Sequence, residues 1–278
     1  MAIVFLFLPQ PLRWSDPVLN KSLIQRLVLP MFMYLMAVFL WRIPRLRAQD
    51  SISLVFWKAV EHSLRLWGAF YLVLIVHFNI KINVGVWRHT LYDPGLLAID
   101  RWLGQWFNWF SAWHAWVNQF YDLTLLYGFV FEAMFLFSFI ILRLGQTERK
   151  FREMFAAIIL VNLLGTVGYV LWPALGPFIA DTPASPYMQE VFAHMYTKYY
   201  AYVSSTGLNY TPSFLTQGLA AMPSLHIGNA VVFTYFIWRD KRRWLSLYLM
   251  VCGFIAIEAL YTRFHYFIDL NNLFFLNL

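Results

Sequence analysis

The stretch AMPSLHIG, residues 221–228, stands at the head of the apolar segment VVFTYFIW, residues 231–238. A serine and a histidine at the mouth of so apolar a segment are energetically costly unless a polar group or a ligand meets them there. Identifying the groups that contact Ser224 and His226 therefore leads to both the fold and the function.

The composition excludes a water-soluble globule. Of the 278 residues, 60% are hydrophobic and only 13% are charged, and long apolar runs recur along the chain. This pattern is typical of a polytopic helical membrane protein. The net charge of +7 does not indicate nucleic-acid binding, because the basic residues gather at the ends of apolar runs. The single cysteine, Cys252, excludes an intrachain disulfide framework and a cysteine-rich metal site.

Six apolar runs are long enough to predict membrane-spanning helices. They cover residues 24–41, 66–80, 122–143, 154–172, 222–238 and 244–262. A partial seventh span follows, because the nine residues after Asp269 allow a rise of about 15 Å at most, near half a bilayer. The predicted fold is an all-α, polytopic transmembrane bundle with six full spans and a partial seventh.

Clusters of basic residues mark alternate connections between these runs. They are Arg42, Arg45, Arg47, Lys58 and Arg65; Arg143, Arg149, Lys150 and Arg152; and Arg239, Lys241, Arg242 and Arg243. The positive-inside rule places these connections in the cytoplasm. Connections 81–121 and 173–221 then lie outside, the second with an expected interfacial helix at 186–203. AMPSLHIG and RFHYFIDL, residues 263–270, consequently meet on the extracytoplasmic side, periplasmic in a bacterium or lumenal in a eukaryote.

The segment RFHYFIDL carries a candidate nucleophile. His265 and Asp269 are four residues apart, so a helix would place them on one face. A carboxylate there accepts the Nδ1–H of the imidazole and leaves Nε2 to attack or to transfer protons. Arg263 adds a permanent cation suited to phosphate. The alternative interpretation is an interfacial ionic pair beside a boundary arginine, although the outer side disfavours such an arginine.

The segment AMPSLHIG supplies complementary groups. Pro223 fits the first turn of a helix, where Ser224 and the neighbouring amides would form an anion site. His226 lies in the same turn and is a candidate acid or base. The alternative is a helix cap beside an interfacial histidine. Because two such segments converge on one face, the functional interpretation is favoured.

Phosphoryl transfer through a phosphohistidine matches these groups. His265 would attack phosphorus while Asp269 stabilises the imidazolium, and Arg263 and Ser224 would hold the phosphate oxygens. His226 would protonate the leaving alkoxide and then deprotonate an incoming alcohol or water. The mechanism needs neither a metal nor another cofactor.

These motifs resemble the type 2 phosphatidic acid phosphatase superfamily, whose second motif centres on P-S-x-H and whose third contains Arg, His and Asp. The nearer resemblance is to its inositol phosphorylceramide synthase and inositolphosphotransferase branch, where the motifs read much like AMPSLH and R-x-H-Y-x-x-D. LWPALGPF (171–178) resembles the proline-rich first motif and YDPGLLAIDRWLG (92–104) the upstream loop of that branch. The resemblance spans roughly residues 90–270. It implies a catalytic core at 66–278, with 1–65 as an additional N-terminal span and cytoplasmic connection.

Two departures from the phosphatases of the superfamily favour the transferase branch. The lysine six residues before Arg-Pro that is typical of their first motif does not precede LWPALGPF. Their third-motif arginine lies further upstream, at the place that Ala259 occupies here. In addition, LNNLFF follows Asp269 where the superfamily usually has a small Ala-Gly pair.

Several other residues are further candidates. Pro173, Gly176 and Pro177 are expected at the rim of the site, or else simply end a helix. Glu258, seven residues before His265, either faces the site or makes an interhelical hydrogen bond. Asp93, Asp100 and Arg101 contact a headgroup or only support a loop. His77 belongs to the site or to the aromatic belt, and His62, His89, His114 and His194 lack metal-ligand spacing.

The sequence thus favours an integral membrane phosphotransferase. Its expected substrates are a phospholipid donor, with phosphoinositol as the transferred group, and a lipid or glycolipid alcohol as acceptor. The first alternative is a lipid-phosphate or polyprenyl-phosphate phosphatase with water as acceptor. A transporter is more distant, because the two halves of the chain show no internal symmetry. The oligomeric state is not indicated.

Overall fold

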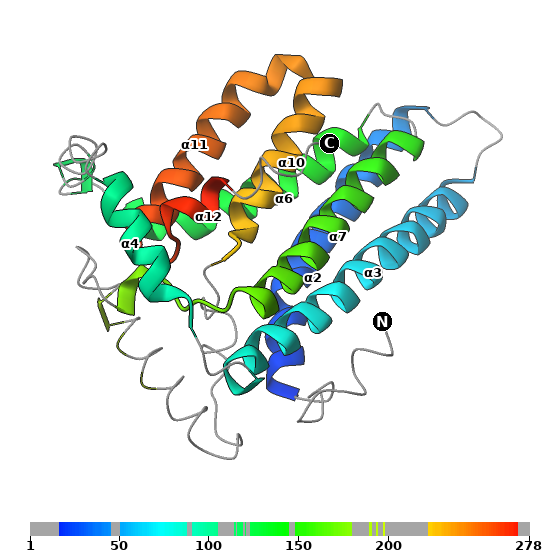
Figure 1. The fold of residues 1–278 in the computed structure, drawn as a ribbon. Helices are drawn as coiled ribbons and strands as arrows, with labels where there is room; N and C mark the ends of the chain where they lie inside the picture. Colours follow the sequence, from blue (N-terminus) through cyan, green and yellow to red (C-terminus); the bar gives the residue numbers. More distant parts are fainter. Residues whose placement is uncertain are drawn as a thin grey trace.

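The computed structural model describes residues 17–45, 51–87, 91–104, 123–144, 148–179 and 222–271, with isolated positions between 114 and 120 and between 189 and 197. Every regular element in these residues is helical (Figure 1). The helices are α2 (Pro17–Arg42), α3 (Ile52–Trp87), α4 (Asp93–Gly104), α6 (Leu123–Arg143), α7 (Glu148–Leu171), α10 (Leu225–Asp240), α11 (Leu245–Tyr261) and α12 (Phe267–Asn271), with single 3-10 turns at Ile43–Arg45, Pro177–Ile179 and Arg242–Trp244. The all-α prediction is confirmed. Most of the helix expected at 186–203 lies outside the described residues.

Each of the six predicted apolar runs is helical over most of its length. Four described segments are long and apolar enough to cross a membrane: Ile52–Phe78, Leu126–Arg143, Arg149–Leu171 and Arg242–Tyr261. α10 has 16 residues, and the described apolar part of α2, Val28–Arg42, is also short. Six full spans with a partial seventh therefore remain a prediction.

Two elements differ from the sequence-based expectation. α3 extends well beyond the predicted run 66–80, because polar residues continue the helix on its N-terminal side, where Glu61 and Arg65 form an i,i+4 ion pair. The expected domain boundary between residues 65 and 66 falls inside this continuous helix. Residues 93–104, expected as a loop, form α4, a helix too short and too amphipathic to register as a membrane span.

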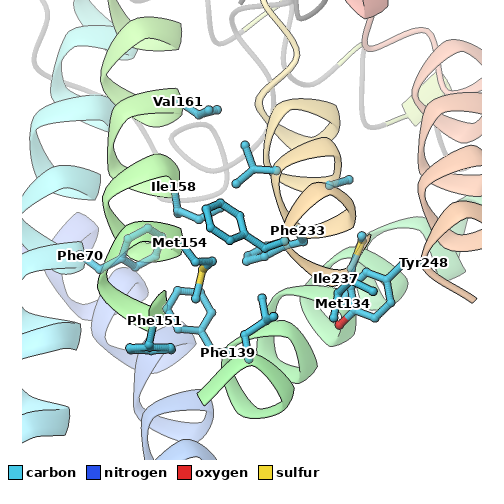
Figure 2. Packing of buried hydrophobic residues seen from close by; sticks show 14 of the residues in the cluster. Phe70, Met134, Phe139, Phe151, Met154, Ile158, Val161, Phe233, Ile237 and Tyr248 are labelled. Carbon is cyan, nitrogen blue, oxygen red and sulfur yellow. The ribbon is translucent and has the colours of Figure 1, made fainter. Parts of the chain in front are cut away.

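α10 lies at the centre of the bundle. It contacts α11, α7 and α6, whereas α3 packs between α2 and α7, and the short α12 lies against α4 (Figure 1). Buried aromatic and aliphatic side chains fill the space between α6, α7 and α10 (Figure 2). Phe233 of α10 is fully buried and meets Phe135 and Phe139 edge to face, with ring centroids 5.2 and 5.9 Å apart. Such contacts fix how α10 sits against its neighbours.

Ionic contacts gather at one end of the bundle. Lys150 Nζ lies 2.8 Å from Asp240 Oδ1, and Arg239 pairs with both Asp240 and Glu153. These contacts bring the 143–153 and 239–243 clusters together. Ser224 precedes α10 and Thr262 follows α11, so both lie at the end of the bundle opposite to these ionic contacts. The predicted convergence of AMPSLHIG and RFHYFIDL at one end is therefore confirmed, while its assignment to the extracytoplasmic side remains a prediction.

Two glycines of α7 allow the start of α10 to approach closely. A Cβ at Gly168 would lie 2.5 Å from Cδ of Pro223, and one at Gly165 would collide with a methyl group of Leu225. Buried amides reinforce this contact, because Asn162 Nδ2 donates to Asn229 Oδ1 at 3.1 Å. The C-terminal half of α7 is thus the surface on which the Ser224 segment rests.

We expect Gly168→Ala to destabilise the protein by about 1–3 kcal/mol, because the new methyl collides with a proline ring that cannot rotate away. Gly253→Ala in α11 is the matched control, since a Cβ there meets nothing within 4 Å. It should be neutral or stabilising by up to about 1 kcal/mol. Unfolding in mixed detergent micelles measures both variants, and equal stability of Gly168→Ala and wild type would contradict the packing argument.

Candidate active site

Ser224 occupies the N-cap position of α10 but does not cap the helix with its side chain. Its backbone is extended (φ −72°, ψ 109°), its side chain is 1% exposed, and its Oγ has no hydrogen-bond partner among the described residues. Buried hydroxyls are normally paired, so an unpaired one at a helix start indicates a place for a ligand oxygen. Pro223 precedes the cap rather than standing in the first turn as expected, because its ring packs on Gly168.

His226 lies in the first turn of α10 and faces α6. Its ring centroid is 4.3 Å from that of Phe131 and 5.4 Å from that of Tyr127. The ring of His265 is 6.5 Å away, centroid to centroid. The two histidines, 39 positions apart in sequence, therefore border one small volume.

The segment after α11 presents His265 through a tight reversal of the chain. Arg263 adopts a left-handed conformation (φ 58°), and its N–H returns to the carbonyl of Leu260, while His265 N–H returns to that of Ala259. A non-glycine residue in this region stores conformational strain, which is common at functional sites. The reversal turns His265 back toward α10.

His265 and Asp269 meet, but not on one helix face. α12 begins at Phe267, after His265. Asp269 lies in the first turn of α12, where its Oδ2 accepts the N–H of Tyr266 at 2.8 Å and lies 3.6 Å from His265 Nδ1. That separation exceeds a hydrogen bond and is one that a bound substrate can tighten. Asp269 is fully buried, and its Oδ1 has no partner within the described chain.

The expected rim residues lie beside this reversal. Gly176 has φ 128°, and a Cβ there would lie 2.8 Å from the carbonyl oxygen of Phe264. Phe178 N–H donates to the carbonyl of Arg263 at 3.3 Å. Pro173 accepts a hydrogen bond from Tyr92 N–H at 2.9 Å, and Pro177 begins a 3-10 turn. The segment 173–178 therefore braces the reversal that carries His265.

Asp93 of α4 ties these segments together. Its carboxylate accepts the N–H groups of Leu175 and Gly176 at 2.9–3.0 Å and the hydroxyl of Tyr266 at 2.7 Å. Asp100, two turns further along the same face of α4, accepts a hydrogen bond from Phe267 N–H at 2.7 Å. From the sequence, each aspartate either contacts a headgroup or supports a loop. The structure shows that both hold the segments around the candidate site in place.

Arg263 lies beside the candidate site, and its positive charge also stabilises the carboxylate of Asp100. Burial raises the pKa of Asp100 to about 6, and the hydrogen bond from Phe267 and the charge of Arg263 oppose that rise. The cation expected to hold phosphate is therefore partly engaged by α4.

Glu258 makes an interhelical contact with a residue that the sequence did not single out. Its Oε1 lies 2.6 Å from Nε2 of His114, whose ring stacks on Tyr261. The sequence gives no sign of this pair, because its two residues are 144 positions apart. Oε2 of Glu258 and the hydroxyl of Tyr127 are buried without a partner among the described residues.

The structure thus brings His226, His265 and Asp269 together in one group, and Ser224 stands two residues before His226 at the start of α10. Arg263 and the rim residues lie beside it. Unpaired buried atoms from three elements belong to this region: Ser224 Oγ, Asp269 Oδ1 and Tyr127 OH. In the described part of the chain, no group of three His, Cys, Asp or Glu side chains has the geometry of a metal site.

The model of the PAP2 superfamily matches residues 94–271, more than half of the chain. The chain belongs to the PAP2 superfamily. No curated protein and no solved structure matches it significantly. PAP2 membership and the apolar helices together identify an integral membrane protein of the lipid phosphatase and phosphotransferase type. Membership in the PAP2 superfamily does not distinguish the inositolphosphotransferase branch from the others.

We expect Asp93→Asn to loosen this PAP2 site, because an amide NH₂ in place of Oδ2 would face the N–H of Leu175, whose hydrogen bond the carboxylate now accepts on both oxygens. Unpaired buried donors of this kind cost about 1–3 kcal/mol each. Tyr266→Phe is the control, since it removes one donor and leaves the carboxylate in place. Thermal unfolding of both variants should show the larger loss for Asp93→Asn, and the reverse order would contradict the assigned role of Asp93.

Proposed function

We propose that the protein is a membrane phosphotransferase that moves a phosphate-linked headgroup from a phospholipid to a lipid or glycolipid alcohol. Phosphoinositol is the headgroup that the motif resemblance implies. The observation that carries the proposal is the pair of imidazoles 6.5 Å apart, with Asp269 behind His265 and an unpaired buried hydroxyl at Ser224. The basic clusters lie at the other end of the bundle, which favours the extracytoplasmic face for the reaction.

The first half-reaction forms a phosphohistidine. Nε2 of His265 attacks phosphorus, and the bond between phosphorus and the oxygen of the donor lipid breaks. His226, protonated at that stage, gives its proton to the leaving alkoxide. Asp269 lies on the Nδ1 side of His265 and stabilises the positive charge that develops on the ring.

The second half-reaction transfers the group to the acceptor. The acceptor hydroxyl attacks phosphorus, His226 takes its proton, and the bond between phosphorus and His265 breaks, which restores both histidines. Ser224, the first amides of α10 and Arg263 hold the non-bridging oxygens as charge builds on them. Each step is assigned to a group of this chain, and no step requires a metal.

Water as acceptor would give a lipid-phosphate or polyprenyl-phosphate phosphatase with the same residues. The motif details favour the transferase, because the first segment LWPALGPF lacks the preceding lysine typical of the phosphatases. A transferase must also keep water from the covalent intermediate until an alcohol arrives. The two functions therefore differ in acceptor dependence rather than in catalytic residues.

We expect His265→Ala to abolish turnover and His226→Ala to stall it, because one removes the nucleophile and the other the proton donor. Asp269→Asn should lower kcat by several orders of magnitude, on the order of 10⁴-fold, while the protein still folds. EDTA should have no effect on the wild type.

His62→Ala is the matched histidine control, since His62 lies by Phe151 near the ionic end of the bundle. Radiolabelled donor should label wild-type protein but not His265→Ala. Strong inhibition by EDTA that a divalent ion reverses would contradict the metal-free mechanism.

We expect purified protein to consume a lipid phosphodiester slowly when it is given alone. Adding the correct alcohol should accelerate consumption and yield a new phosphodiester with ping-pong kinetics, because the intermediate then has an acceptor. Mass spectrometry of the lipid products measures this directly. Rapid release of inorganic phosphate from a phosphomonoester lipid, unaffected by any alcohol, would instead identify the phosphatase.

A further inference from the structure

α3 carries a second group of polar side chains at the end that reaches the site. His77 and Lys81 are four residues apart and share one face of this helix. Nδ1 of His77 lies 2.9 Å from Oγ1 of Thr166 in α7, whose own hydroxyl donates to the carbonyl of Asn162 at 2.6 Å. Because that hydroxyl proton is already used, Nδ1 of His77 is the donor, and a neutral ring keeps its lone pair on Nε2. His77 is thereby fixed without adding charge.

Lys81 lies above Tyr169, with Nζ 5.7 Å from the ring centroid. Tyr169 is 2% exposed, and its ring centroid is 5.4 Å from that of His77. The charge of Lys81 acts on His226, and the charge of Asp269 acts on Tyr169. The ammonium group therefore borders the same region as the catalytic candidates.

The ammonium of Lys81 has no counter-charge among the described residues. No described carboxylate lies within ion-pair distance of it, and loss of hydration on burial is the main influence on its pKa. Burial lowers the pKa of Lys81 to about 8, so the charged form still predominates at neutral pH. Lys81 is half-buried, and an ammonium group that no described carboxylate neutralises is suited to a negatively charged ligand.

We propose that Lys81 binds the phosphate group of the substrate, so that α3 provides a cation absent from the first motif. The proposal rests on the proposed function for the identity of that anion. The two cations then differ in their surroundings. The charge of Arg263 also acts on Asp100 of α4, whereas no described carboxylate lies within ion-pair distance of Lys81. A lipid headgroup phosphate and inorganic phosphate share the chemistry that Lys81 would recognise.

The test compares Lys81→Met with Lys58→Met in the full-length protein. Lys58 is an exposed lysine at the other end of the same helix, so it matches Lys81 in residue type and element. Inorganic phosphate should stabilise wild type and Lys58→Met against thermal unfolding. For Lys81→Met we expect about 10- to 100-fold weaker phosphate binding and a similar rise in KM for the lipid phosphodiester. Lys81→Arg should retain most of the affinity, because it keeps the charge.

The outcomes separate the two proposals. Phosphate affinity and KM unchanged in Lys81→Met, alongside an active wild type, would overturn the role of Lys81 and leave the proposed function standing. A wild type that neither turns over a lipid phosphodiester nor binds phosphate would overturn the function itself. If Lys81→Met fails to fold, Lys81→Gln replaces it, and a phosphate affinity equal to wild type in that variant would overturn the inference.

Discussion

The carboxylate of Asp93 is the interaction on which the arrangement of the site depends. It is 1% exposed and collects three donors from two distant segments, the backbone N–H groups of Leu175 and Gly176 and the hydroxyl of Tyr266. Hydrogen bonds of this kind offset the cost of burying a carboxylate. Tyr266 follows His265 directly, so the same anion that orders the 173–178 segment also fixes where the imidazole stands.

The sequence predicted which candidate groups lie near one another but not the means by which they are held. Ser224, His226, His265 and Asp269 could be found because each is a costly polar residue at the end of an apolar run, and alternating basic clusters placed those ends together. The His265–Asp269 spacing suggested one helix face, whereas the chain reverses at Arg263 and α12 starts later. A spacing of four is satisfied by a helix or by a turn that leads into one, and local pattern does not separate the two.

The supporting contacts could not be predicted because they join residues far apart in sequence. Asp93 and Tyr266 are 173 positions apart, and His114 and Glu258 are 144 apart. Hydropathy also passed over α4, because 12 amphipathic residues lie below the length of a span and look like an aromatic loop. Conversely, the apolar runs were predicted well, because a helix that crosses a membrane is apolar along its whole length.

The last two turns of α7 set the distance between the two sides of the site. On one face Gly165 and Gly168 let Leu225 and Pro223 approach, which fixes the start of α10 and with it Ser224 and His226. On another face, Thr166 forms a hydrogen bond with His77 of α3. Tyr169 lies beneath Lys81 of the same helix. Because α7 is one continuous helix between these contacts, the hydroxyl of Ser224, which has no partner among the described residues, and the side chain of Lys81 are both positioned against the same helix. A site whose groups rest on one continuous helix needs little reorganisation when a substrate binds, which is the condition for electrostatic stabilisation of a transition state.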